Sequence, residues 1–203
     1  MTELKDLTIE EFAKVTASDA PAPGGGSVAA AAGSLAAALA EMVANLTIGK
    51  EKYAEAENEM RELAEKGQAI REKLIADIQR DSSSFNLYMA ALRMPKDTEE
   101  EKAARREAMQ RGLKEAAVVP LSVAETASEI FPLAEAAVDR GNANAVTDGL
   151  VSAMMARTAV LSALLNVKIN LNSIKDEAFR ADMEKQVKGL EKTASEYEAK
   201  KLK

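Results

Sequence analysis

The sequence contains no cysteine and no histidine, and these two absences exclude much of the common enzyme chemistry. Without cysteine there is neither a disulfide framework nor thiol catalysis. Without histidine as well, a Ser-His-Asp triad, a Cys-His pair and a zinc site built from the usual ligands are all excluded. We therefore expect no metal site, and any proton transfer must be carried out by Asp, Glu, Lys or Tyr side chains.

Aromatic residues are also scarce, since they make up 3% of the 203 residues and tryptophan is absent. Alanine is plentiful, which favours helices that pack closely through small side chains. A β sandwich would need more aromatic and β-branched residues. We expect an all-α fold in which residues 1–203 form one helical-bundle domain around a single core.

The net charge and the first residues of the sequence indicate which partners and which cellular location to expect. A formal net charge of −6 argues against a nucleic-acid partner, because phosphate binding needs a surplus of Lys and Arg. Residues 1–11 are charged and lack the apolar segment of a secretory signal, so we expect a cytoplasmic protein. Residues 27–48 are apolar and almost long enough to span a membrane. Glu41 and Asn45 interrupt this segment, so we expect a buried helix and no membrane partner.

Periodicity and capping signals predict several helices. Residues 27–48 and 148–172 are expected to be two long apolar core helices, and residues 51–93 show an apolar period of three and four. Thr8 and Thr98 each precede a Glu by three residues, which is the capping-box pattern of a helix start. Pro120 is expected to kink or end the helix that contains it.

A glycine-rich stretch, PGGGS, precedes the first apolar helix at residues 23–27. Gly24, Gly26 and Ala29 fit the G-x-G-x-x-A dinucleotide pattern, but no β-strand precedes them, and the Gly-Lys-Ser/Thr of a Walker A loop is absent. Two interpretations remain. The backbone N–H groups at the helix start bind an anion or a polar ring edge, or the glycines form a flexible entry loop with Ser27 as N-cap.

A line of polar residues follows the second apolar helix: Asn142, Asn144, Asp148, Ser152, Ser162, Asn166 and Asn170. Asp148 and Asn166 are 18 residues apart, so they share one helix stripe but lie about 27 Å from each other. Either a site lies near Asp148 alone, or a long ligand or a second subunit connects the two ends. Alternatively, these polar groups satisfy one another, because they are costly in an apolar setting without partners.

Two charged residues are further candidates. Asp81 falls on the core-facing stripe of residues 51–93, and burial would raise the pKa of its carboxyl, as suits a proton donor. The alternative is a helix–helix hydrogen bond. Lys50 is a possible ligand for substrate carboxylates, or an ordinary surface lysine.

Three segments of the sequence, residues 21–53, 81–121 and 141–171, resemble the cyclodeaminase/cyclohydrolase family. Its members are the cyclodeaminase half of formiminotransferase-cyclodeaminase and the stand-alone methenyltetrahydrofolate cyclohydrolases. The resemblance implies a helical homodimer that binds folate in a cleft lined by the glycine loop. It implies no metal or redox cofactor, only a tetrahydrofolate derivative as substrate.

The resemblance also implies roles for individual residues. Asp148 is expected to be the catalytic carboxylate, with Asp81 as its partner or substitute. Pro23, Gly24, Gly25, Gly26, Asn166 and Asn170 match motifs of the family and are expected to bind the substrate. From the residue patterns described above, we also expect Ser27, Lys50, Asn142 and Asn144 to bind it.

Two reactions are compatible with this resemblance. In cyclohydrolysis, water adds to the amidinium carbon of methenyltetrahydrofolate and one nitrogen is expelled, so a carboxylate acts first as base and then as acid. In cyclodeamination, a folate nitrogen attacks a formimino carbon and ammonia leaves. We expect the cyclohydrolase, because NLTIGKEKY and DTEEEKAARREAM are closest to the stand-alone enzymes and no formiminotransferase domain is fused. A non-catalytic folate-binding dimer is a third alternative.

Overall fold

The computed structural model describes residues 2–201, and over that range it contains helices and no strand. The α-helices are α1 (Ile9–Thr16), α2 (Gly25–Asn45), α3 (Glu57–Leu92), α4 (Glu99–Ser128), α5 (Ile130–Arg140), α6 (Val146–Leu171) and α7 (Glu177–Lys201). Short 3-10 helices cover Leu4–Asp6, Glu51–Ala56 and Ala143–Ala145. The predicted all-α fold is confirmed.

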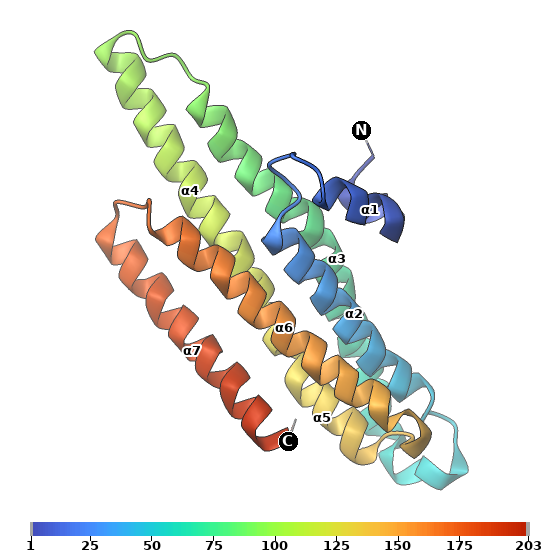
Figure 1. Cartoon of the computed structure of the whole chain (residues 1–203). Coiled ribbons are helices and arrows are strands. Elements are labelled where there is room, and N and C mark those ends of the chain that lie inside the picture. The colour runs from blue at the N-terminus through green and yellow to red at the C-terminus, as the bar shows by residue number, and fades with distance from the viewer. Residues whose placement is uncertain (1, 202–203) are drawn as a thin grey trace.

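The long helices lie side by side (Figure 1). α2 packs against both α3 and α6, and α4 also packs against α3 and α6. α5 follows α4 toward one end of the bundle, and α7 runs along α6. The glycine-rich loop before α2 lies far from the end where α5 turns back into α6. The two ends of α6 are therefore in different surroundings.

Small side chains bring α2 and α6 close together. Ala36 and Ala156 are fully buried, and a Cβ added at Gly33 would lie 3.3 Å from the Cβ of Ala159. The buried hydroxyl of Ser152 donates a hydrogen bond to the carbonyl oxygen of Ala36 over 2.7 Å. α2 and α6 are the two long apolar helices that the sequence predicts.

Some predicted helix boundaries are confirmed and others are wrong. Thr8 and Thr98 both form capping boxes, as expected. Pro120 does not end its helix, because α4 continues to Ser128. Its ring is fully buried, so packing outweighs the backbone hydrogen bond that a proline removes. Ser27 is not an N-cap: Gly24 occupies that position, and Ser27 lies in the first turn of α2.

Three segments are long and apolar enough to cross a membrane by length and composition alone: Gly25–Asn45, Glu99–Arg140 and Ala143–Leu171. Much of each apolar stretch is buried inside the bundle. α2 and α6 nevertheless expose large apolar side chains, which we call the α2/α6 apolar face: Val28, Leu35, Met42, Leu46, Val151, Met154, Leu165 and Ile169. Leu165 and Ile169 are the most open of them, at 66% and 65% exposed. Exposed apolar side chains that gather in this way are common at sites of protein interaction.

Candidate functional site

The Asp81 carboxyl of α3 lies directly against the first turn of α2. The Ser27 hydroxyl, fully buried, donates a hydrogen bond to Oδ2 of Asp81 over 2.8 Å. A Cβ added at Gly26 would lie 2.2 Å from Oδ1 of Asp81 and 2.6 Å from its Cγ. Glycine is therefore required at position 26 because any side chain would displace this carboxyl.

A second polar side chain reaches the same loop from α6. A Cβ added at Gly25 would lie 2.9 Å from Nδ2 of Asn166. That amide nitrogen donates to the carbonyl oxygen of Ser162, and Nδ2 of Asn170 donates to the carbonyl oxygens of Ala116 and Asn166. Among the hydrogen bonds between described residues, neither side-chain oxygen takes part, so both remain as acceptors for a ligand.

These residues border a cavity of about 140 Å³. Six of its residues were predicted from sequence: Gly24, Gly25, Gly26, Asp81, Asn166 and Asn170. The others were not: Pro21, Ala22, Ser82, Ser84, Phe85, Ala116 and Ile169. Phe85 carried a detectable signal, because it follows Asp81 by four residues on the same helical stripe. Pro23 is buried and does not line the cavity.

Burial raises the pKa of the Asp81 carboxyl above its ordinary value. Hydrogen bonds from the hydroxyl and the backbone amide of Ser27 act in the opposite direction, as does any helix N-terminus. The nearby carboxylate of Asp77 adds to the increase. Desolvation is the largest of these effects, so Asp81 holds its proton to a higher pH than a carboxyl in water.

The remaining predicted residues gather at the other end of the bundle. Asn142 connects the loop before α6 to the end of α2 through two hydrogen bonds. Its backbone N–H donates to Thr47 Oγ1 over 2.8 Å, and its Nδ2 donates to the carbonyl oxygen of Leu46 over 2.9 Å. Asn144 and Lys50 are exposed, and Asp148 is half-buried in the first turn of α6. We call Lys50, Asn142, Asn144 and Asp148 the distal cluster.

Within one chain the distal cluster does not reach the glycine loop. α6 is continuous from Val146 to Leu171, so the 18 residues between Asp148 and Asn166 place them about 27 Å apart. The expectation that Asp148 and Asp81 act together is therefore not met inside a single chain. Along residues 2–201, no group of three or more Asp and Glu side chains is arranged to hold a metal ion.

The chain is similar to proteins of known activity. A family model described as formiminotransferase-cyclodeaminase matches residues 8–189. The chain is 42% identical to the methenyltetrahydrofolate cyclohydrolase of Methylorubrum extorquens, over 90% of this chain and 88% of that protein. It is 36% identical to the formimidoyltransferase-cyclodeaminase of Sus scrofa over 90% of this chain, which spans 34% of that longer protein.

A crystal structure of the formiminotetrahydrofolate cyclodeaminase of Thermotoga maritima has the same fold, with a TM-score of 0.86 and 33% sequence identity. The alignment covers 96% of this chain and 93% of that one. The helical arrangement is thus shared with that protein along almost the whole chain.

Proposed function

Because the chain belongs to the formiminotransferase-cyclodeaminase family, we propose that it is a methenyltetrahydrofolate cyclohydrolase. It hydrolyses 5,10-methenyltetrahydrofolate to 10-formyltetrahydrofolate in the cytoplasm, with the folate as substrate and no further cofactor. The observation that carries this proposal is the desolvated Asp81 carboxyl, which Ser27 holds at the edge of the cavity in the space that Gly26 leaves.

The cavity suits a flat ring that donates hydrogen bonds. A pterin ring carries an amino group and a ring N–H, and the free side-chain oxygens of Asn166 and Asn170 are acceptors. Gly24 lines the cavity, and a Cβ added there would meet nothing within 4 Å, so a ring can approach the backbone at the start of α2. The methenyl group is a delocalised cation, which a carboxylate stabilises.

The reaction needs one group that takes a proton and returns it. As the water oxygen bonds to the amidinium carbon, a carboxylate removes a water proton. As the carbon–nitrogen bond to N5 then breaks, the carboxylic acid protonates N5. The hydroxyl of the tetrahedral intermediate loses its proton to water as its C=O bond forms, and the formyl group stays on N10. A carboxyl with a raised pKa performs both steps near neutral pH, and Asp81 is the carboxyl of that kind in this cavity.

We further propose a homodimer in which the distal cluster of one subunit completes the cavity of the other. A cavity of about 140 Å³ is small beside the roughly 300–1,000 Å³ of typical ligand sites. Ile169 both lines this cavity and belongs to the α2/α6 apolar face. A second copy that covers this face therefore also covers the cavity.

The orientation of the partner follows from where the two ends of the face lie. The face runs from Ile169, at the cavity, to Leu46 and Val151, beside the distal cluster. A two-fold axis perpendicular to α2 and α6 places one end of each subunit on the opposite end of its partner. Asp148 of the partner subunit then meets Asp81, which overcomes the separation of about 27 Å inside one chain.

Mixing two inactive variants tests the shared site. Asp81→Asn and Asp148→Asn should each lose about a hundredfold or more in kcat. In a heterodimer of the two, one site carries both substitutions and the other carries neither. Co-expression should therefore restore about a quarter of the wild-type activity, since half of the dimers are mixed and each has one intact site. If both variants fold and their mixture regains no activity, Asp81 of one subunit and Asp148 of the other do not form a common site.

The reaction itself is tested by absorbance. Purified protein should consume the methenyltetrahydrofolate chromophore without added metal or nucleotide. The cyclodeaminase is the second candidate, because the Thermotoga maritima structure that shares this fold carries that name. It would instead produce the chromophore from formiminotetrahydrofolate and release ammonia. Tight folate binding with neither signal would indicate a non-catalytic binding protein.

A further inference from the structure

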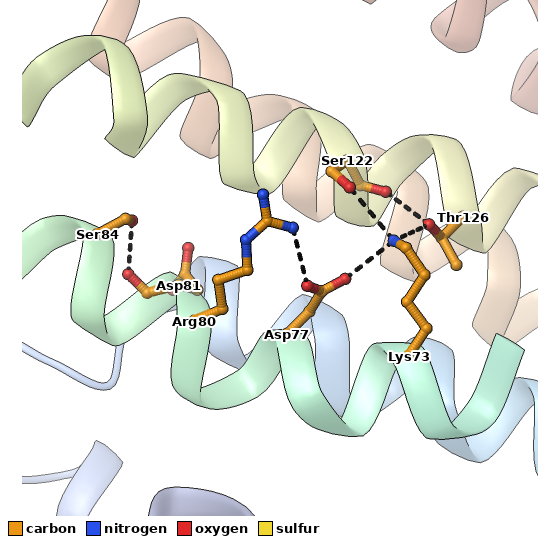
Figure 2. A network of polar contacts seen from close by, with 7 residues as sticks. All are labelled: Lys73, Asp77, Arg80, Asp81, Ser84, Ser122 and Thr126. Carbon is orange, nitrogen blue, oxygen red and sulfur yellow. Dashed lines mark hydrogen bonds and ion pairs between the residues drawn. The ribbon is translucent and has the colours of Figure 1, made fainter. Parts of the chain in front are cut away.

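One helical turn before Asp81, a second carboxylate is buried between α3 and α4. Asp77 is 3% exposed. Its Oδ2 accepts from Nζ of Lys73 over 3.2 Å, and its Oδ1 accepts from Nη1 of Arg80 over 3.3 Å (Figure 2). Two cations therefore converge on one carboxylate that does not line the cavity.

The Lys73 ammonium is held by three partners. Besides Asp77 it donates to Oγ of Ser122 over 3.2 Å and to Oγ1 of Thr126, both on α4. The buried Thr126 hydroxyl in turn donates to the carbonyl oxygen of Ser122 over 2.8 Å. All three ammonium protons are thus committed, which fixes Lys73 against α4.

Arg80 is the residue immediately before Asp81, yet its guanidinium turns toward Asp77 (Figure 2). Among the described residues no ion pair joins Arg80 to Asp81, and the partners of the Asp81 carboxyl come from Ser27. An arginine beside a carboxylate within a few ångströms would favour its ionised form. The orientation of the Arg80 side chain therefore affects the ionisation of the neighbouring Asp81 carboxyl.

We propose, on the basis of the proposed function of Asp81, that Asp77 is a positioning residue for that carboxyl. Asp77 holds Lys73 and Arg80 beside α4, so that Asp81 faces the cavity without a cationic partner. Asp77 itself does not touch the substrate. Its effect is to keep two positive charges away from the group that transfers the proton.

The groups around Asp81 support this role. α2 presents Gly26 and Ser27 to it, α6 presents Asn166 to the same cavity, and none of these titrates. Asp77 is the charged residue that acts on Asp81, and its carboxylate raises the pKa of the Asp81 carboxyl. Removal of the Asp77 charge would both withdraw this effect and release the two cations.

A titration that does not depend on activity tests the inference. The carboxyl carbon of Asp81 is followed by ¹³C NMR against pH in the full-length protein, with its signal assigned from Asp81→Asn. In Asp77→Asn the Asp81 midpoint should move to lower pH. In Asp77→Asn/Arg80→Gln, where one released cation is gone, the midpoint should return part of the way. Asp182→Asn, on the exposed face of α7, is the matched control and should not move it.

Each outcome decides the question. A midpoint that stays unchanged in folded Asp77→Asn would overturn the inference and leave Asp77 a purely structural residue. If Asp77→Asn does not fold, Lys73→Met/Asp77→Asn removes the carboxylate together with one of its two cations. It should show a smaller downward shift, because only Arg80 is then released. The pH profile of kcat should shift in the same direction. Inactivity of the wild-type protein would refute the proposed function but would not affect the titration.

Discussion

The contact between Gly26 and Asp81 gives the sharpest prediction. An alanine at position 26 would place its Cβ 2.2 Å from Oδ1, 2.6 Å from Cγ and 2.7 Å from Oδ2 of Asp81. Ordinary contact begins at 3.4 Å, so the shortfall at Oδ1 is about 1.2 Å. The carboxyl must move by about that distance, or the start of α2 must move away from α3.

The cost to catalysis follows from the size of this displacement. A misplacement of about 1 Å in a reacting group can cost about a hundredfold in rate, or about 2.7 kcal/mol of transition-state stabilisation. We expect Gly26→Ala to lower kcat by about this factor in the methenyltetrahydrofolate absorbance assay. Overpacking should also destabilise the fold by about 1–3 kcal/mol, partly offset by the better helix propensity of alanine.

The other two loop glycines provide graded comparisons. A Cβ at Gly25 meets the Asn166 amide at 2.9 Å, and a Cβ at Gly24 meets nothing within 4 Å. Gly25→Ala should therefore affect substrate binding through Asn166, and Gly24→Ala should act on KM and leave the Asp81 carboxyl in place. Gly189→Ala, on the exposed side of α7, controls for helix propensity. Wild-type kcat in a correctly folded Gly26→Ala protein would refute the role given to Asp81.

Three further predictions concern stability and assembly. Because burial raises the pKa of Asp81, the native state binds its proton more tightly than the unfolded chain does. Wild type should lose stability relative to Asp81→Asn as pH rises above the ordinary value of 3.8, measured by urea unfolding at several pH values. A pH-independent difference would contradict this. Gly112→Ala should cost about 1–3 kcal/mol in the same assay, because its Cβ would lie 2.8 Å from the backbone Cα of Tyr88; unchanged stability would show that α3 and α4 can separate freely. Leu165→Glu should convert the proposed homodimer to a monomer in sedimentation, and a dimer of undiminished affinity would exclude the α2/α6 apolar face as the interface.

Much of the fold and part of the site could be predicted from sequence, because both depend on local periodicity. The stripe through residues 51–93 placed Asp81 toward the interior, and the structure sets its carboxyl against α2. The rise per residue of a helix also predicted that Asp148 and Asn166 lie far apart, and α6 is indeed continuous between them. Neither argument could tell that Gly26, rather than Gly24, meets the carboxyl, because that depends on how α2 and α3 cross.

Asp77 is not among the candidate residues that we selected from the sequence. It lies on the same stripe as Asp81, and the sequence already carries Lys73 four residues before it and Arg80 three residues after it. Such spacings allow ion pairs on one helix face. By these spacings Asp77 has two cationic neighbours and Asp81 has none. The pattern could therefore have distinguished an ion-paired carboxylate from one that is free to transfer a proton. What it could not supply was α4, whose Ser122 and Thr126 fix the lysine.

The absence of histidine explains why these two carboxylates must differ. A chain without imidazole obtains a proton-transfer group near neutrality only if it moves a carboxyl pKa upward or an amine pKa downward. Burial does this at Asp81, but the Ser27 hydrogen bonds oppose it, and an arginine side chain at position 80 would oppose it further. Asp77 removes that arginine from competition by binding it. Burial of Asp81 is thus the main cause of its raised pKa, and we expect Asp77 to preserve that effect by holding the cations.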